Sequence, residues 1–498
     1  MLDRNHQVTD HGGQDPRRWL VLAVVLVAQM MIMIDATVVN VALPSAQHSL
    51  GFSDAARGWV VTAYVLAFGS LLPLGGRMSD LWGRKRIFLI GLVGFALFSA
   101  LGGAAWNTAV LMTSRTFQGV FAALLAPAAL STVAVTFTAP AERNRAFAIF
   151  GAVAGSAGAL GLLLGGVLTS YTSWRWCMYV NLAFAAAAIP GTIALMTNQA
   201  ERERRRLDMR GALLSTGGLF GIVFGASRAQ TVGWATLETL GPLSVGCGLL
   251  IGFVVFERTV QHPLVAPRVF LHRDRGAAYL AQALANVALF AAFLFLTYYF
   301  QGVRGYSPVR TGLAFLPLPI AIGAAASFTQ GVLVSRIPTR GIVGFGLCLS
   351  AVGAAFLTGA RVDAAYTTWT LPGLVLLGAG IGSALVVAIA MGTIGVDPAD
   401  AGTAGAMNNV SQQIGAAVGI ALIGSISARA ASRYTLAHPA RPDLITYANV
   451  HGFIVGYRVC EVIFLVTAAI CTVVMTRTPL RPTAPSAATR ATADVLLR

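Results

Sequence analysis

Residues 75–86 read Gly-Gly-Arg-Met-Ser-Asp-Leu-Trp-Gly-Arg-Lys-Arg, and the remainder of the chain can be oriented from this stretch. It lies between two apolar runs, roughly 56–76 and 87–105, each long enough to cross a bilayer as a helix. Arginine and lysine beside membrane helices favour the cytoplasmic side. The stretch is therefore predicted to be a short, glycine-punctuated basic loop on that side, with Asp80 as its one carboxylate.

The composition indicates a membrane protein. The 498 residues are 56% hydrophobic and only 11% charged, whereas charged residues make up about a quarter of a soluble domain. Residues 1–18 are polar and the first apolar run is long enough to span, so no cleavable signal peptide is expected. The five cysteines fall in or beside apolar runs and are interpreted as small core residues.

Apolar runs of about 20 residues recur along the whole chain and predict an all-α polytopic fold with fourteen spans. The predicted spans are roughly 18–42, 56–76, 87–105, 108–130, 145–168, 175–196, 211–229, 237–256, 277–300, 311–334, 341–359, 367–390, 405–427 and 453–475.

The positive charges test this count. Of the 35 Lys and Arg, 24 fall in alternate segments on the side of the 75–86 stretch, nine fall on the opposite side and two lie within spans. This asymmetry predicts fourteen crossings in the cytoplasmic membrane with both termini cytoplasmic. The net charge of +16 then reflects topology and contact with anionic lipid, and nucleic acid is not an expected partner.

The spans suggest an organisation of six, two and six helices. The predicted segments are a cytoplasmic tail (1–17), a first bundle (18–200), an inserted helix pair (201–260), a second bundle (261–476) and a disordered cytoplasmic tail (477–498). Residues 428–452 are predicted to be a long outer loop.

Two ionisable residues within the spans are candidates for function, because a charge inside a bilayer is costly unless paired or hydrated. Asp35 lies in the outer part of the first span and Arg115 on the fourth. Counting from the helix ends places both roughly 10 Å deep. They could neutralise each other as a fixed ion pair, or compete for a proton in a wet cavity; the residues alone leave both readings open.

Other polar or small residues in the spans have plainer interpretations. Arg458 and Glu461 are three residues apart on the last span and are predicted to pair on one helix face. Glycines of the fifth span, with the candidate hinge Gly158, Gly161, Gly165 and Gly166, allow close helix packing. The candidate residues for a substrate cavity are Met31, Asn40, Gln118, Tyr298 and Gln412.

The energy source is inferred from what the sequence does not contain. The chain has a single lysine, Lys85, which lies between two arginines and not in a Gly-Lys-Ser/Thr phosphate-binding loop. None of the seven histidines lies within a predicted span, so neither a metal site nor a histidine proton relay is expected. No cofactor is therefore expected, and an ion gradient is the expected drive.

Several motifs together resemble a known family. Residues 76–86 (Gly-x-Met-Ser-Asp-x-x-Gly-Arg-Lys-Arg) resemble the signature between helices two and three of the major facilitator superfamily. Residues 35–44, 115–119 and 174–176 are similar to its fourteen-helix drug–proton antiporter branch, as is the segment 298–317. The resemblance covers residues 18–475.

The resemblance implies two six-helix bundles that rock about a central cavity, with an extra helix pair inserted between them. It implies that a gating network holds the outward-facing arrangement and that Asp35 and Arg115 take part in proton coupling. The residues of that network are Gly76, Asp80, Gly83, Arg84, Lys85 and Arg86. One departure is Leu162, which stands where the family usually has a proline, so the expected kink is removed.

The sequence therefore predicts a non-enzymatic, proton-driven exporter of amphipathic or hydrophobic small molecules such as antibiotics and dyes. Its expected partners are these compounds, protons and membrane lipid. A dedicated exporter of one endogenous metabolite is the alternative. A membrane enzyme, receptor or channel is more remote, since an enzyme would need clustered intramembrane acids or histidines.

Overall fold

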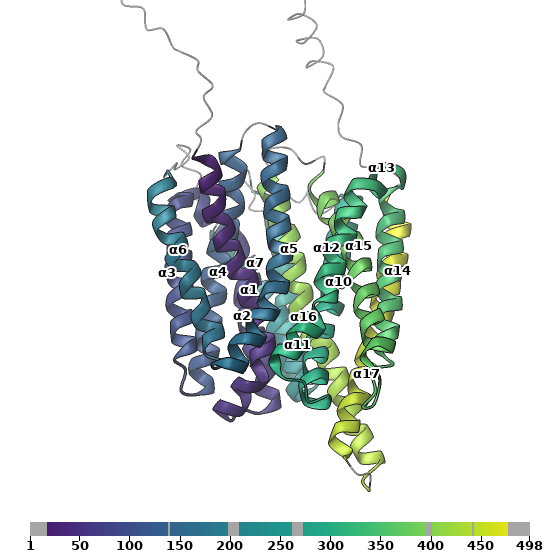
Figure 1. Cartoon of the computed structure of the whole chain (residues 1–498). Coiled ribbons are helices and arrows are strands. Elements are labelled where there is room, and N and C mark those ends of the chain that lie inside the picture. The colour runs from purple at the N-terminus through teal and green to yellow at the C-terminus, as the bar shows by residue number, and fades with distance from the viewer. Residues whose placement is uncertain are drawn as a thin grey trace, which may run out of the picture.

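The computed structural model is a bundle of long helices that run nearly parallel to one another (Figure 1). It describes residues 17–476, apart from 138–139, 198–208, 261–271, 395, 397–400 and 441–442. Every regular element in these described ranges is helical. The predicted tails at 1–16 and 477–498 lie outside the described residues.

The first eight helices are α1 (Arg18–Leu50), α2 (Asp54–Trp82), α3 (Arg84–Gly103), α4 (Thr108–Thr136), α5 (Pro140–Tyr171), α6 (Trp176–Leu195), α7 (Met209–Val232) and α8 (Leu237–Glu257). The second half contains α10 (Arg273–Tyr298), η1 (Tyr299–Val303), α11 (Pro308–Phe315), α12 (Pro317–Phe328), η2 (Thr329–Leu333), α13 (Val334–Arg336), α14 (Thr339–Leu357), η3 (Tyr366–Thr370), α15 (Leu371–Thr393), α16 (Ala401–Ala437) and α17 (Leu444–Val474), where η marks a π-helical turn.

Thirteen helical rods in the described ranges are long and apolar enough to cross a membrane, and α5 adds a helix of 32 residues. Local signals start several of them: Ser53 accepts a hydrogen bond from Ala56 N–H, and Asn107 accepts one from Val110 N–H. Pro308 occupies the first turn of α11, where a missing N–H costs nothing. The fourteen-helix, all-α membrane fold is confirmed.

Two hydrophobic cores organise the bundle. One is formed mainly by α1–α6 and the other mainly by α10–α17, and Figure 1 shows these groups side by side. A few residues cross over: Val410 of α16 belongs to the first core, and Val41 of α1 and Leu162 of α5 belong to the second. The α7–α8 pair packs through α7 against α2 and α16, while α5 packs against α11 and α12. The predicted boundary at residue 200 and the start of the second bundle at 261 fall outside the described residues.

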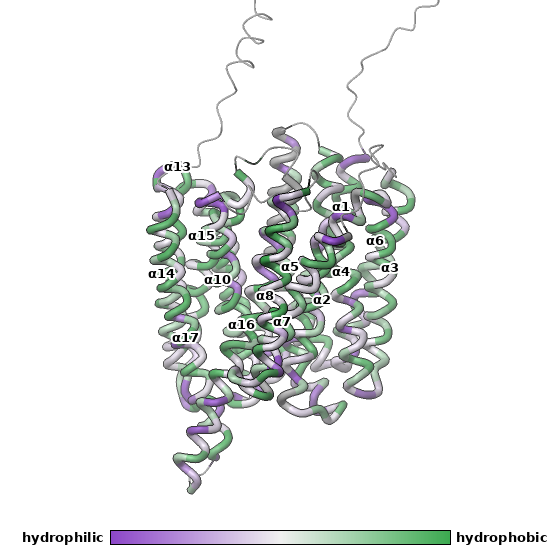
Figure 2. Tube along the Cα trace, turned by 180° about the vertical axis from the view of Figure 1, so that it is seen from behind, coloured by the Kyte–Doolittle hydropathy of each residue, from purple (hydrophilic) through white to green (hydrophobic). Residues whose placement is uncertain are grey.

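Figure 1 shows α1 beginning and α17 ending at the same end of the bundle. At that end, the backbone N–H of Thr476 donates to Asp274 Oδ1 over 2.7 Å and joins the chain after α17 to the start of α10. We call this the terminal end and the opposite one the distal end. Figure 2, coloured by hydropathy, shows apolar residues along the middle of the rods.

The stretch at 75–86 is not the loop that the sequence predicts. Helix α2 continues to Trp82 and α3 begins at Arg84, so Gly83 alone separates them. Gly83 has φ 90° and ψ 135°, a conformation that only glycine adopts readily. Hydropathy marks the apolar part of a helix and not its end, and residues 77–82, which include Arg77, Ser79 and Asp80, continue α2.

The predicted outer loop at 428–452 is also mostly helical. Helix α16 runs to Ala437 and α17 begins at Leu444, so the two helices extend as a hairpin beyond the distal end of the other rods (Figure 1). Residues 428–437 contain several alanines, two arginines and a leucine, which have high helix propensity. They can therefore extend α16 beyond its apolar part.

Gly83→Ala is expected to lower the unfolding free energy by about 1–3 kcal/mol, because a side chain at this backbone conformation is strained. The measurement is unfolding in mixed micelles. Gly76→Ala is the matched control, since an added Cβ there would lie an ordinary 3.6 Å from Pro127 Cβ. Equal stability of the two variants would contradict the argument.

Candidate functional site

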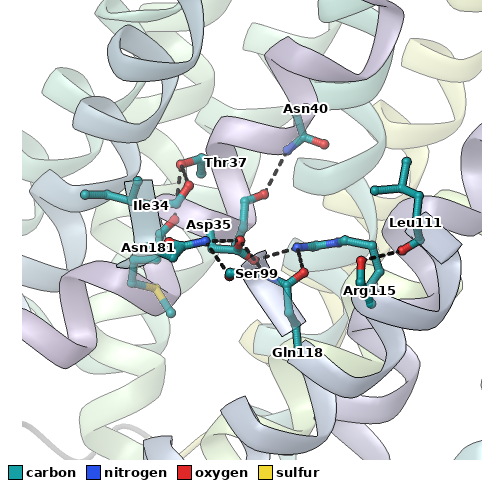
Figure 3. Close-up of polar contacts among 12 residues, drawn as sticks. Ile34, Asp35, Thr37, Asn40, Ser99, Leu111, Arg115, Gln118 and Asn181 are labelled. Atoms are coloured by element: carbon teal, nitrogen blue, oxygen red, sulfur yellow. Dashed lines mark hydrogen bonds and ion pairs between the residues drawn. The ribbon is translucent and has the colours of Figure 1, made fainter. Parts of the chain in front are cut away.

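Asp35 and Arg115 meet inside the first bundle. Arg115 Nη1 on α4 donates to Asp35 Oδ2 on α1 over 2.7 Å, and both side chains are fully buried (Figure 3). The sequence placed the two residues at similar depth, and the structure shows that they form an ion pair. A buried pair is weak evidence for stability, because desolvation can exceed the attraction between the charges.

Amide side chains complete the surroundings of the carboxylate. Asn181 Nδ2 on α6 donates to Asp35 Oδ1 over 2.7 Å, and Gln118 Nε2 donates to the same oxygen over 3.3 Å. Both amides also donate to Ser99 Oγ on α3, at 3.0 and 2.6 Å. Figure 3 shows these side chains converging on Asp35 from different helices.

The guanidinium of Arg115 has two further neighbours. Its Nη1 also donates to Gln118 Oε1 over 3.0 Å, and its Cζ lies 4.3 Å from the centre of the Tyr64 ring on α2. The ring face provides a cation–π contact to the buried guanidinium, and Tyr64 is itself buried. The site thus holds one negative and one positive charge, surrounded by neutral groups from α1, α2, α3, α4 and α6.

A cavity of about 10 Å³ adjoins Arg115, which is room for about one water molecule. Its other lining residues lie toward the distal ends of their helices, and they include Val39, Leu43, Leu111 and Met178. The charged pair therefore has a small void on its distal side.

Close helix packing positions the network. An added Cβ at Gly119 on α4 would collide with the backbone oxygen of Tyr64, and at Gly75 on α2 it would collide with that of Ala123. Helices α2 and α4 can therefore approach closely enough to place the Tyr64 ring against Arg115.

The four candidate hinge glycines contact two different partners. Added Cβ atoms at Gly161 and Gly165 would each lie 2.9 Å from a backbone oxygen of α1, belonging to Ile34 and Val38. At Gly166 the nearest atom would be Pro308 O on α11, at 2.6 Å, while Gly158 has ordinary space. Three of these glycines therefore face α1, and Gly166 faces the second bundle.

Leu162, in the place of the family's proline, is 1% exposed and packs with the core of the second bundle. Helix α5 continues through it. Across the same seam, an added Cβ at Gly312 on α11 would lie 2.7 Å from Leu162 O. Leu162 therefore contributes an interbundle contact.

Of the predicted gating residues, Lys85 has the clearest contact: its Nζ donates to Ile193 O in the last turn of α6, over 2.7 Å. A cation at a helix C-terminus interacts favourably with the unpaired carbonyl groups there. Gly83 forms the helix break, and Arg84 and Arg86 lie in the first turn of α3. The side chain of Asp80 is outside the described part of the structure.

The five candidate cavity residues do not gather in one place. Met31 and Gln118 are buried within the first bundle, and Asn40 Nδ2 donates to Ala36 O on its own helix. Tyr298 on α10 stacks under Arg57 of α2, with Cζ 3.5 Å from the ring centre. Gln412 on α16 donates to Gln282 Oε1 over 3.3 Å.

Gln412 belongs to an amide network in the second bundle. Gln282 Nε2 on α10 donates to Asn408 Oδ1 over 2.8 Å, and Asn286 Nδ2 donates to Gln282 O over 2.8 Å. Asn408 Nδ2 donates to Ile389 O on α15. These bonds link α10, α15 and α16.

The predicted pairing of Arg458 with Glu461 is wrong. Both residues are described, and no ion pair within 4.0 Å and no hydrogen bond joins them, although their spacing on α17 permits one. Arg458 is exposed and Glu461 is half-buried beside α14. A long arginine on an exposed helix face can be solvated without a carboxylate partner, so the spacing alone does not enforce the pair.

Asn181, Ser99, Tyr64 and Gln282 are the network members that the sequence analysis missed. Each is a single polar residue in an apolar run, which is a weak signal by itself. Among the described residues, no group of three or more His, Cys, Asp and Glu side chains lies close enough together to hold a metal ion.

Asn181→Leu is expected to lower the unfolding free energy by about 1–3 kcal/mol, because the carboxylate loses a short hydrogen bond. Unfolding in mixed micelles measures this. Asn40→Leu is the control, since Asn40 donates only to its own helix at 3.2 Å. The assignment fails if Asn40→Leu costs as much as Asn181→Leu.

Comparison with known proteins identifies the family. Residues 25–420 match the model of the Major Facilitator Superfamily. The chain belongs to the major facilitator superfamily. It is 44% identical to the puromycin resistance protein pur8 of Streptomyces alboniger, over 93% of this chain and 92% of that one. It is 36% identical to the cephamycin export protein CmcT of Amycolatopsis lactamdurans, over 81% and 83% of the two chains.

Solved structures support the same fold. The crystal structure of the POT family transporter PepTSo matches with a TM-score of 0.67 at 13% identity, and covers 91% of this chain and 98% of that one. The protein is therefore a multi-pass membrane protein of the superfamily's transporter class, as the motifs at 76–86 and 115–119 predict. The resemblance to the drug-exporting branch agrees with the relatives, which are antibiotic resistance and export proteins.

Proposed function

We propose that this transporter is a proton-coupled antiporter that exports amphipathic or hydrophobic small molecules across the cytoplasmic membrane. Both termini, and so the terminal end of the bundle, are cytoplasmic in this proposal, as the distribution of arginine favours. Puromycin is the first cargo to test, because the relative with 44% identity is named a puromycin resistance protein.

The buried Asp35–Arg115 pair is the observation that carries the proposal. A proton bound at Asp35 removes the negative charge, so the 2.7 Å contact from Arg115 Nη1 loses its electrostatic attraction. Arg115 is then a buried cation whose remaining support comes from Gln118 and the Tyr64 ring. A change of protonation at one atom can thus alter how α1 and α4 are held together.

In this proposal the proton reaches the pair from the distal side. The small cavity beside Arg115 lies on the distal side of the pair, which is the outer side in this orientation. The cavity walls offer a water molecule no polar partner, so water would pass through it only briefly, carrying a proton donor toward the pair. The apolar lining of the cavity limits exchange with bulk water, so the charge state of the pair can persist between steps.

The two bundles are joined at the distal end. Gln301 Nε2 after α10 donates to Val41 O on α1 over 3.1 Å, and Arg57 stacks on Tyr298. The α5–α11 contact at Gly166 and Gly312 continues this distal seam. In the proposal this is the state with the outer side closed, and separation of these contacts opens it.

The test is transport by purified protein in proteoliposomes with an imposed proton gradient. Puromycin and ethidium should move against the proton flux, and either compound should release lumenal protons when no gradient is imposed. If transport is independent of the proton gradient and no protons move, the protein is a carrier but not a proton antiporter.

A narrow exporter is the second candidate, and the names of the relatives favour it, since pur8 and CmcT are each named for one antibiotic class. A susceptibility panel on an expressing strain separates the candidates. A shift for puromycin alone supports the narrow exporter, whereas shifts for unrelated dyes and antibiotics support broad export.

A further inference from the structure

A groove of about 320 Å³ lies on the outer face of the second bundle, on the far side from the Asp35–Arg115 pair. It runs between α14 and α17, which lie at the edge of the molecule in Figures 1 and 2. The small side chains of Ala351 and Ala355 form its α14 wall, and Leu465 lies on α17. In a membrane this face meets lipid.

Glu461 is the charged residue of the groove. It projects from α17, and no ion pair or hydrogen bond from the described residues satisfies its carboxylate. Arg458 lies three residues nearer the distal end and is exposed, so it can reach the phosphates of the outer leaflet. The carboxylate therefore faces an apolar groove with no cation from the described part of the chain.

Two aromatic rings line the same groove as Glu461. Phe356 on α14 and Trp369 in η3 lie with ring centres 6.2 Å apart at 50° to each other, and both line the groove. The indole packs directly on Gly359, where an added Cβ would collide with it, so its position is fixed by contact with the backbone. Trp369 remains 43% exposed, so one side of it is open to a ligand.

A carboxylate next to aromatic faces is the chemistry that recognises organic cations, by charge and by cation–π attraction. The level of the groove suits a ligand from the membrane. Its α14 lining runs from Ala351 to Phe356 and ends one residue before the distal end of that helix, close to the headgroup level of the membrane. At that level, amphipathic molecules keep their charge near the headgroups and their rings among the acyl chains.

We propose that this groove is a lateral binding site for lipophilic monovalent organic cations dissolved in the outer leaflet, with Glu461 as counter-ion and Trp369 and Phe356 as ring contacts. The site goes beyond the proposed export mechanism. It can bind its ligand whether or not Asp35 couples transport to protons.

The probe is tetraphenylphosphonium, with tetraphenylborate as a partner of the same shape and opposite charge. The full chain, in nanodiscs of phosphatidylcholine, carries Asp35→Asn in every sample, so that binding at the ion pair does not contribute. A photoreactive phosphonium derivative should label peptides from α14 or α17 that line the groove, and the borate analogue should not.

Glu461→Gln is expected to weaken phosphonium binding at least about tenfold, and Glu461→Asp to restore most of it. Trp369→Leu should weaken binding by several fold. Arg458→Gln is the matched control, because it removes a charge one turn away and leaves the carboxylate; binding should be unchanged or tighter.

Unchanged binding in Glu461→Gln, or equal labelling by the borate, would show an apolar crevice and overturn the proposal. Weaker binding in Arg458→Gln than in Glu461→Gln would also overturn it. A negative result in this binding assay would not change the result expected in the antiport assay. Conversely, absence of proton antiport would not change the phosphonium binding expected at Glu461.

Discussion

Asp35→Asn is expected to reduce proton-driven efflux at least about 100-fold, the scale on which a positioned proton-transfer group contributes. The amide keeps the size of the carboxyl group and an acceptor for Arg115, but it cannot take up a proton. It also leaves the Arg115 guanidinium buried without a counter-charge, which costs about 3–5 kcal/mol when one partner of a buried pair is removed. The measurement is substrate efflux in proteoliposomes together with unfolding in mixed micelles.

The double variant Asp35→Asn/Arg115→Gln separates a coupling role from a fixed ion pair. Two neutral, hydrogen-bonding residues remove the unpaired charge, so stability should return to near that of the unmodified protein. Efflux should stay absent, since no titrating group is present. Recovery of proton-driven efflux in the double variant would show that the pair serves structure alone.

Glu238→Gln provides the control for removing one partner of an ion pair. Glu238 pairs with Arg228 between α7 and α8, where the side chains are 59% and 37% exposed. Exposed pairs contribute about 0–1 kcal/mol, so both efflux and stability should be retained. A loss comparable to that of Asp35→Asn would point to a general effect of charge removal.

Gly166→Val is expected to reduce efflux at least about tenfold while the protein stays folded. The added side chain would lie 2.6 Å from Pro308 O and 2.8 Å from Val309 Cα, so the α5–α11 seam cannot close. Because the contact lies between bundles, separating them relieves the clash without disturbing either core. The population should therefore shift toward the state in which the distal seam is open.

Gly161→Val is the matched comparison on the same helix. Its side chain would lie 2.9 Å from Ile34 O, inside the first bundle, so no rigid movement of the bundles can relieve the clash. This variant should lose stability by about 1–3 kcal/mol, as over-packed cores do. The two glycines should thus separate a conformational effect from a folding effect.

The reporter for seam opening is maleimide labelling of Val41→Cys, in a background that lacks the exposed Cys247 and Cys348. Val41 is fully buried and belongs to the core of the second bundle although it lies on α1. Its labelling rate should rise at least about tenfold in Gly166→Val. A protected Val41→Cys with normal efflux would refute the assignment of this seam as a moving contact.

The helix count and the meeting of Asp35 with Arg115 could be predicted from the sequence, because hydropathy and the 1.5 Å rise per residue fix how deep a residue lies on its helix. The other members of the network could not. Asn181 on α6 donates to the carboxylate, and Ser99 on α3 accepts from the same amide. The rotation of those two helices about their axes depends on packing that no local sequence pattern records.

The failures have the same origin. Helix α2 continues to Trp82 and α16 to Ala437, so loss of hydropathy does not end a helix. Arg458 and Glu461 have the correct spacing for a pair, yet spacing permits a contact without requiring it. The division among the hinge glycines, in which Gly166 on α5 faces α11 of the second bundle, depends on helices far apart in sequence.

Lys85 makes the molecule a natural single-site reporter. It is the chain's one lysine, and its amine is held by the Ile193 carbonyl at the end of α6. An amine-reactive ester can therefore attach at most one dye to the side chains, apart from the α-amino group, and needs no engineered residue. Its acylation rate then follows how often the first turn of α3 separates from α6.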